Sequence, residues 1–211
     1  MRALALYENL PASVRFHTRV RSFTCPISAV VGRVPATGRL LEVGCGHGLF
    51  ANEAALRNPG LSVLGIDPAP EKVRWAEATL PGRTGIRFRA ERLEDLEEGS
   101  FDALAVLDVL YLVPRGQWPA FLGGCRDRLR PGGRLLLKEV DLRPRWKFYR
   151  CVLQEVVSVR LLGITLGGAL AFAGREEMAA LLAGLGFSGV TVADLGRGYW
   201  TPHVLYEASR S

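Results

Sequence analysis

The chain has 211 residues, of which 48% are hydrophobic and 23% charged. This length corresponds to a little over one domain of about 150 residues. The composition is that of a globular protein and excludes a disordered or collagen-like chain. The formal net charge is +6, and arginine dominates the basic residues, because lysine occurs only at positions 72, 138 and 147. This bias reflects either codon composition or a basic surface for anionic partners.

Four cysteines are present, and none forms a CxxC pair. We therefore expect free thiols in a reducing compartment and no metal site. No apolar signal segment follows the first residue. The longest uncharged run covers residues 161–174, which is shorter than the roughly 20 residues that cross a bilayer. These features predict a cytoplasmic protein.

Residues 1–38 predict a helical segment, since Ile27, Val30, Val31 and Val34 share one helical face. Strands and helices then alternate along the chain. The predicted strands are 39–43, 62–66, 86–90, 101–109 and 134–140, and the predicted helices are 49–57, 70–80 and 115–129. Residues 130–133 predict a turn.

This alternation predicts an α/β fold with a doubly wound, mostly parallel seven-stranded sheet and helices on both faces. The alternation of strands and helices ends after residue 140, where we expect a helical insertion. A helix at 175–185 and two strands, 188–194 and 204–208, complete the chain, and we expect these strands to form an antiparallel hairpin.

The most informative segment is LLEVGCGHG at residues 40–48, which lies between a predicted strand and a predicted helix. Without Cβ atoms, its three glycines let the backbone turn sharply and approach a ligand. The next helix offers free N–H groups to an anionic group. Asp67, at the end of the second strand, can accept hydrogen bonds from both hydroxyls of a ribose. Leu49 occupies the third glycine position of the dinucleotide pattern GxGxxG, which weakens that alternative.

The glycine segment is accompanied by four further motifs. They are LGIDP at 64–68, GSFDALAVLDVLYLVP at 99–114, LRPGGRLLLKE at 129–139 and AGREEMAALLAGLGF at 173–187. Together the chain resembles the class I S-adenosylmethionine-dependent methyltransferases. The resemblance is strong over residues 39–140 and moderate over 174–208. It implies one domain with a helical cap (1–38), a cofactor-binding core (39–140), a helical substrate lid (141–174) and a C-terminal helix with a strand hairpin (175–211).

The resemblance implies S-adenosylmethionine as the cofactor. Its methionine end would be held by residues of the first motif, namely Glu42, Gly44, Cys45, Gly46 and Gly48.

The nucleoside end would contact the ends of the next two strands. Asp67 would bind the ribose hydroxyls, and Pro68 would pack near the adenine. The family usually shows an aspartate after the third strand, where this chain reads AERLED at 90–95. Glu91, Arg92 and Leu93 are the candidates for contact with the adenine amino group.

Asp108, at the end of the fourth predicted strand, would lie beside the sulfonium or the methyl acceptor. Tyr111 would shape the acceptor site, donate a proton or pack in the core. His47 could deprotonate an acceptor or simply point away from the loop. For His17 and His203, which flank the predicted crevice, a structural role is expected. Asp108, Tyr111 and His47 are therefore the catalytic candidates.

The insertion begins with the basic, aromatic stretch 143–150 and continues as an apolar stretch to residue 172. It is either a lid over a lipid-, isoprenoid- or polyketide-like acceptor, with contact to an anionic headgroup or the inner membrane face, or a helix buried against the core or a dimer partner.

The sequence therefore predicts methyl transfer to a small hydrophobic metabolite, by a monomer or homodimer. An RNA or protein acceptor is one alternative, although the basic residues are scattered and no [DN]PP[YF] motif follows the fourth strand. A noncatalytic protein of the same fold is the other alternative.

Overall fold

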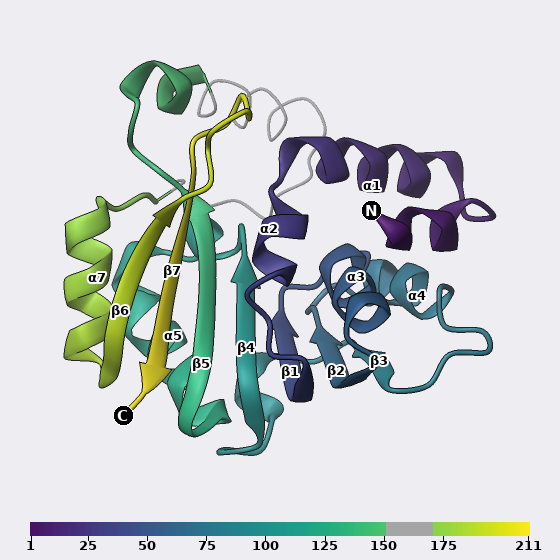
Figure 1. Ribbon diagram of the computed structural model, residues 1–211, viewed down its shortest axis with the longest axis horizontal. Helices are drawn as coiled ribbons and strands as arrows, with labels where there is room; N and C mark the ends of the chain where they lie inside the picture. Colours follow the sequence, from purple (N-terminus) through teal and green to yellow (C-terminus); the bar gives the residue numbers. More distant parts are fainter. Residues whose placement is uncertain (151–170) are drawn as a thin grey trace.

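The computed structural model describes residues 1–150 and 171–211, and within these residues seven strands form one sheet (Figure 1). The strand order is β3-β2-β1-β4-β5-β7-β6, with neighbours parallel from β3 to β5 and antiparallel from β5 to β6. The strands are β1 (Thr37–Val43), β2 (Gly60–Ile66), β3 (Ile86–Arg89), β4 (Phe101–Leu107), β5 (Leu129–Val140), β6 (Phe187–Asp194) and β7 (His203–Arg210). The predicted doubly wound sheet with a C-terminal antiparallel hairpin is confirmed.

Helices cover both faces of the sheet, because the central strands are apolar on both sides. Leu40 packs with α2 (Ile27–Val31), α3 (Leu49–Arg57) and α4 (Pro70–Glu77), whereas its neighbour Leu41 packs with α5 (Trp118–Arg128) and α7 (Arg175–Gly184). Successive residues of a strand point to opposite faces, so each central strand contributes to two cores.

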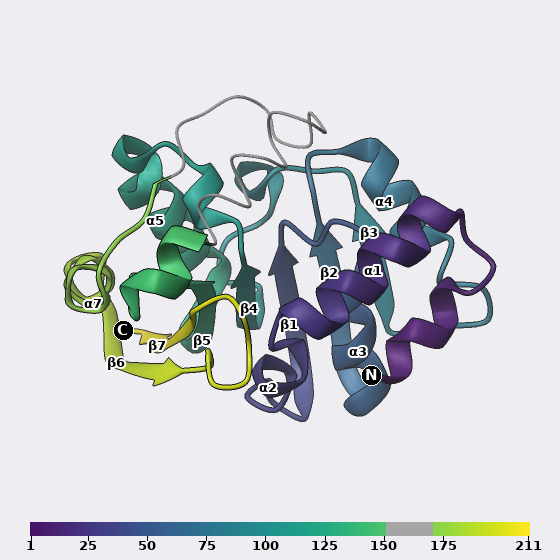
Figure 2. The same ribbon diagram turned by 90° about the horizontal axis from the view of Figure 1, so that it is seen from above.

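The N-terminal residues form η1 (Arg2–Tyr7), α1 (Ala12–Thr24) and α2. Figure 2, which looks onto the carboxyl ends of the parallel strands, shows α1 lying across this edge of the sheet. Short 3-10 turns, η2 (Leu93–Asp95), η3 (Leu110–Leu112) and η4 (Arg115–Gln117), complete the described part. None of the helices in residues 1–150 and 171–211 is long and apolar enough to cross a membrane.

Among the predicted boundaries that differ from the structure, two bear on the site. The fourth strand ends at Leu107 rather than 109, because Asp108 has a left-handed backbone with φ +59° that extended strands do not adopt. The fifth strand begins at Leu129, which pairs with Phe101, so the predicted turn at 130–133 is an irregularity within the ladder. Most of the expected helical insertion, with Cys151, lies in residues 151–170 outside the described part.

A buried polar cluster joins the N-terminal turn to the sheet. The side chain of Asn52, which has no exposed surface, donates from Nδ2 to Tyr7 Oη at 2.9 Å and to Thr79 Oγ1 at 3.0 Å. Tyr7 Oη in turn donates to the carbonyl oxygen of His47 at 2.8 Å, and burial raises the pKa of Tyr7. Elements η1, α3 and α4 are thereby tied to the loop after β1.

We expect the substitution Asn52→Ala to lower the free energy of unfolding by about 2–3 kcal/mol, because it removes the hydrogen bonds that Nδ2 donates to Tyr7 and Thr79 and the one that Oδ1 accepts from Arg83. Urea denaturation would measure this. Asn58→Ala is the matched control, because Asn58 lies at the end of the same helix and its side chain donates a single long hydrogen bond within the described residues, to Ala54 O at 3.3 Å. Equal losses in the two variants would contradict the structural role of the cluster.

Candidate active site

The loop after β1 is fastened to the end of β2. The backbone N–H groups of Gly44 and Cys45 both donate to the carbonyl oxygen of Ile66, at 2.8 and 2.9 Å. Gly44, Gly46 and Gly48 have φ of +75°, +54° and +77°. These left-handed conformations strain any residue with a Cβ, so the sequence pattern and the turn agree.

The three glycines meet different neighbours. A Cβ on Gly44 would lie 2.4 Å from Val109 Cγ2, and one on Gly48 would lie 2.5 Å from Phe88 Cζ. A Cβ on Gly46 would meet no atom within 4 Å. Gly44 and Gly48 therefore allow close packing of the loop, whereas Gly46 faces open space in which a ligand can approach the backbone.

Asp67 lies at the tip of β2 and is 7% exposed. Its Oδ2 accepts a hydrogen bond from the N–H of Gly46, and its Oδ1 accepts one from the N–H of Ala69, both at 2.9 Å. Each oxygen keeps a second lone pair for a further donor. The carboxylate predicted to bind a ribose is thus fixed against the glycine loop, and Pro68 beside it is exposed.

Glu42 is buried beneath the loop, where its Oε2 accepts a hydrogen bond from the N–H of Ala51 at 3.0 Å. This contact satisfies one of the free N–H groups in the first turn of α3. Burial raises the pKa of Glu42 to about 8. Cys45 is buried next to it, and burial raises the pKa of its thiol.

The three candidates for adenine contact lie in different environments. Arg92 is exposed, and Glu91 is half-buried with an ion-pair distance of 3.6 Å to Arg89. The side chain of Leu93 packs into the core shared with α5. The side chain of Leu93 therefore faces the protein interior.

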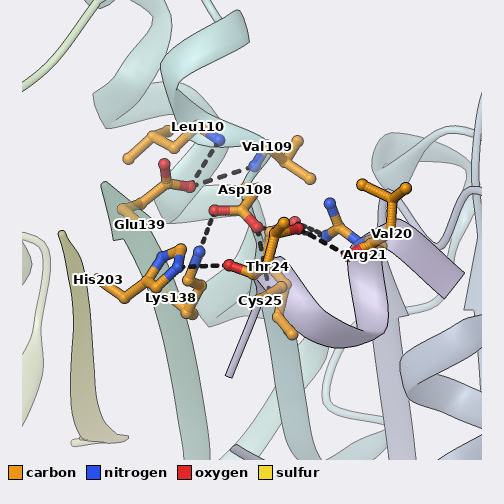
Figure 3. Close-up of polar contacts among 11 residues, drawn as sticks. Val20, Arg21, Thr24, Cys25, Asp108, Val109, Leu110, Lys138, Glu139 and His203 are labelled. Carbon is orange, nitrogen blue, oxygen red and sulfur yellow. Dashed lines mark hydrogen bonds and ion pairs between the residues drawn. The ribbon is translucent and has the colours of Figure 1, made fainter. Parts of the chain in front are cut away.

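Asp108 is the centre of a charged cluster at the end of β4 (Figure 3). Its Oδ1 pairs with Nζ of Lys138, a residue of β5 with no exposed surface. Its Oδ2 lies 3.4 Å from Arg21 Nη2 and accepts a hydrogen bond from Cys25 Sγ at 3.5 Å. Burial alone would raise the pKa of Asp108, but the charges of Lys138 and Arg21 outweigh burial and hold it at about 2. The carboxylate is therefore ionised at neutral pH.

Glu139 fixes the turn that follows. Its Oε1 accepts hydrogen bonds from the N–H groups of Val109 and Leu110, at 3.2 and 2.9 Å. Burial, followed by the charge of Asp108, raises the pKa of Glu139 to about 8. Among these positions, the sequence reasoning identified Asp108 alone. Two adjacent charged residues, Lys138 and Glu139, directly after the apolar run Leu135–Leu137 were the available signal.

A cavity of about 460 Å³ opens beside Asp108. Its walls come from the end of α1, the ends of β4 and β5, the helical residues 145–150 and the loop between β6 and β7. The lining residues are Arg21, Thr24, Cys25, Asp108, Tyr111, Val140, Arg150, Trp200, Thr201 and His203. Tyr111 also stacks on Phe172 with ring centroids 5.8 Å apart. Asp108 and Tyr111 thus line one cavity.

Two of the histidines considered above, His17 and His47, are not among the residues that line this cavity. His47 packs against His17 of α1, with ring centroids 4.8 Å apart, and burial lowers the pKa of His47. His203, in contrast, lines the cavity. Its Nε2 lies 2.8 Å from the carbonyl oxygen of Thr24, so Nε2 carries the proton, and its Nδ1 has no partner among the described residues. Burial, then Lys138, lowers the pKa of His203 to about 4, which keeps the ring neutral.

Comparison with known proteins agrees with these features. Residues 41–135 match a family model described as a methyltransferase domain. The ubiquinone biosynthesis O-methyltransferase of Xanthomonas axonopodis pv. citri (strain 306) is 37% identical over 114 residues, which cover 52% of this chain and 46% of that protein. The chain thus spans about half the length of this curated relative.

Two solved structures resemble the fold. Magnesium protoporphyrin IX methyltransferase from Synechocystis PCC 6803, with bound SAH, has a TM-score of 0.70 at 20% identity and covers 98% of this chain and 91% of its own. Geranyl diphosphate C-methyltransferase from Streptomyces coelicolor A3(2) has a TM-score of 0.66 at 15% identity and covers 88% and 75%. The chain therefore carries a match to a methyltransferase domain over residues 41–135 and has the fold of solved S-adenosylmethionine-dependent methyltransferases.

We expect Lys138→Met to raise the pKa of Asp108 and to lower the free energy of unfolding by about 3–5 kcal/mol at pH 7, because a buried carboxylate loses its main partner. In the wild type, the low pKa of Asp108 contributes stability above pH 4, and this contribution is lost as the pH falls toward about 2. Chemical denaturation across this pH range would measure both effects.

The double variant Lys138→Met/Asp108→Asn is the control, because it removes both charges together. It should recover much of the loss caused by Lys138→Met alone. A double variant that is less stable by the sum of the two single losses would contradict a direct interaction between the two side chains.

Proposed function

We propose that the protein transfers the methyl group of S-adenosylmethionine to a small hydrophobic molecule held in the cavity beside Asp108. One observation carries this proposal: the glycine loop and the cavity meet at neighbouring strand ends. Strands β1 and β4 pair in parallel, and Gly44 packs against Val109, the residue after Asp108. A ligand along the loop would therefore end where the cavity begins.

The chain offers suitable groups for this cofactor. Gly46 leaves open space at the backbone, and the Asp67 carboxylate has lone pairs for two hydroxyl donors. The cofactor supplies a methyl group on a positively charged sulfur. The ionised carboxylate of Asp108 favours positive charge at this end of the site. Glu42 would support the methionine end from beneath the loop.

The acceptor site combines aromatic and charged walls. Tyr111 and Trp200 provide apolar surface, whereas Arg21 and Arg150 provide positive charge. Methyl transfer is an in-line displacement, for which correct positioning contributes about 7–11 kcal/mol and a base adds about 10²–10⁴-fold. We therefore assign Tyr111 a role in positioning the acceptor. The names of the similar proteins refer to ubiquinone, magnesium protoporphyrin IX and geranyl diphosphate, which supports a small-molecule acceptor.

The cofactor assignment is tested by calorimetric titration with S-adenosylmethionine and S-adenosylhomocysteine. We expect micromolar binding by the wild type and at least tenfold weaker binding by Asp67→Ala, which removes a ribose acceptor and the support of the glycine loop. Asp127→Ala is the control, since Asp127 lies at the opposite end of the sheet, in the last turn of α5. No binding by the folded wild type would refute the proposal.

The acceptor assignment is tested with labelled methyl donor and a panel of phenols and prenyl compounds of increasing apolar length. We expect transfer to improve with apolar length. Tyr111→Ala should raise the acceptor KM about tenfold, through loss of an aromatic contact, with unchanged cofactor binding. Tyr111→Phe should stay close to the wild type. A large loss of kcat in Tyr111→Phe would instead assign the hydroxyl a chemical role.

A further inference from the structure

Helix α1 has two faces of different character. Val14 and Thr18 are buried, and Arg21 and Cys25 extend this row toward Asp108. The opposite side carries Phe16, Val20 and Phe23 at helical spacing, and the two phenylalanines are 73% and 78% exposed. Large aromatic side chains in water at this spacing form an apolar stripe directed away from the protein.

Two other segments present aromatic residues at the same edge of the sheet. Trp146, in the helical residues 145–150, is 61% exposed, and Trp200, in the loop between β6 and β7, is 71% exposed. Lys147 Nζ ties the two segments together by donating to the carbonyl oxygens of Gly196 and Tyr199, at 3.0 and 2.7 Å. Figures 1 and 2 show the loop between β6 and β7 beside the C-terminal end of α1, with helical residues 145–150 on the far side of this loop.

These three segments define what we call the aromatic-basic face, residues 12–24, 143–150 and 195–202. They contain eight basic residues, of which Arg21 points inward to Asp108, and no acidic residue. The net charge of the whole chain is +6, so the remainder of the chain is net negative. The positive charge of the protein is therefore concentrated on this face. Within the described residues, Arg19, Arg143, Arg145 and Arg197 of this face make no ion pair.

We infer that the aromatic-basic face docks on an anionic lipid bilayer. Aromatic side chains insert at the level of the headgroups, and basic side chains around them bind the negatively charged lipids. Each basic residue close to such a surface contributes about fivefold to binding, which falls as salt screens the charges.

The charge pattern favours this partner over two others. A second copy related by a two-fold axis would bring the outward basic residues of the face against each other, and like charges oppose association. A nucleic acid would neutralise the basic residues but would leave the stripe of Phe16, Val20 and Phe23 in water. A bilayer satisfies both the charges and the apolar side chains.

The face also surrounds the cavity. Arg150 and Trp200 form a cation–π pair, with Arg150 Cζ 4.3 Å from the centre of the Trp200 ring. Both residues, and Thr24 of α1, belong to the face and also line the cavity. A hydrophobic molecule dissolved in the bilayer would thus meet the cavity at the docking surface. Lipid binding itself is independent of methyl transfer, so it extends beyond the proposed function.

Vesicle flotation of the full chain tests the inference, with phosphatidylcholine vesicles alone or containing about one third phosphatidylglycerol. We expect binding to the anionic vesicles only, weakened by high salt. Phe16→Ser/Phe23→Ser and Arg19→Glu/Arg197→Glu should each weaken this binding by at least tenfold. Because these side chains are exposed, circular dichroism and cofactor titration should remain as in the wild type.

Two matched controls lie outside the face. Val192→Ser removes an exposed apolar side chain from β6, and Arg87→Glu reverses a charge on β3. Both should bind within twofold of the wild type. Equal binding to the two vesicle types, no binding, or equal losses in the controls would overturn the inference. The inference would also be overturned if the wild type did not bind vesicles and the face variants instead lost a dimer or lost RNA binding. Vesicle binding by a chain that fails to bind cofactor would refute only the proposed function.

Discussion

The site depends on the buried ion pair between Asp108 and Lys138. Lys138 has no exposed surface, and a lone charge there would cost several kcal/mol, so the carboxylate has to stay beside it. The pair holds Asp108 in its left-handed conformation and thereby ends β4 at Leu107. Glu139, the residue after Lys138, then secures the turn at Val109 and Leu110. Two adjacent residues of β5 thus determine where the chain leaves the sheet.

The position of this turn also shapes the glycine loop after β1. Val109 lies so close to Gly44 that a Cβ at position 44 would overlap it. On the other side of the loop, Phe88 of β3 lies so close to position 48 that only a glycine fits there. The loop is therefore clamped between the ends of β3 and β4, and Gly46 is left facing open space. The ligand edge results from packing constraints as much as from the backbone freedom of glycine.

Local patterns predict most of the fold and the cofactor half of the site. Alternating strands and helices, and the glycines followed by Asp67, are contiguous in sequence and can be identified without a structure. Of the acceptor half, the sequence indicates Asp108 and Tyr111 but not the charged groups around Asp108. Arg21, Lys138 and His203 come from α1, β5 and β7, and only the sheet order brings them together. The burial of Leu93 is not evident from the sequence, because its neighbours are polar, whereas α5 offers it an apolar site. The roles of the site residues stay predictions.

Helix α1 connects the cavity with the aromatic-basic face, because one helix supplies both the cavity wall and the outer face. Arg21 reaches inward to Asp108, and the carbonyl oxygen of Thr24 accepts the proton of His203, so the inner side of α1 is fixed by polar contacts. The outer side has no such constraint and carries Phe16 and Phe23 in water. Exposure of two aromatic side chains costs free energy that burial in a lipid surface would recover. A partner for this side would also lie within one helix diameter, about 10 Å, of the cavity mouth.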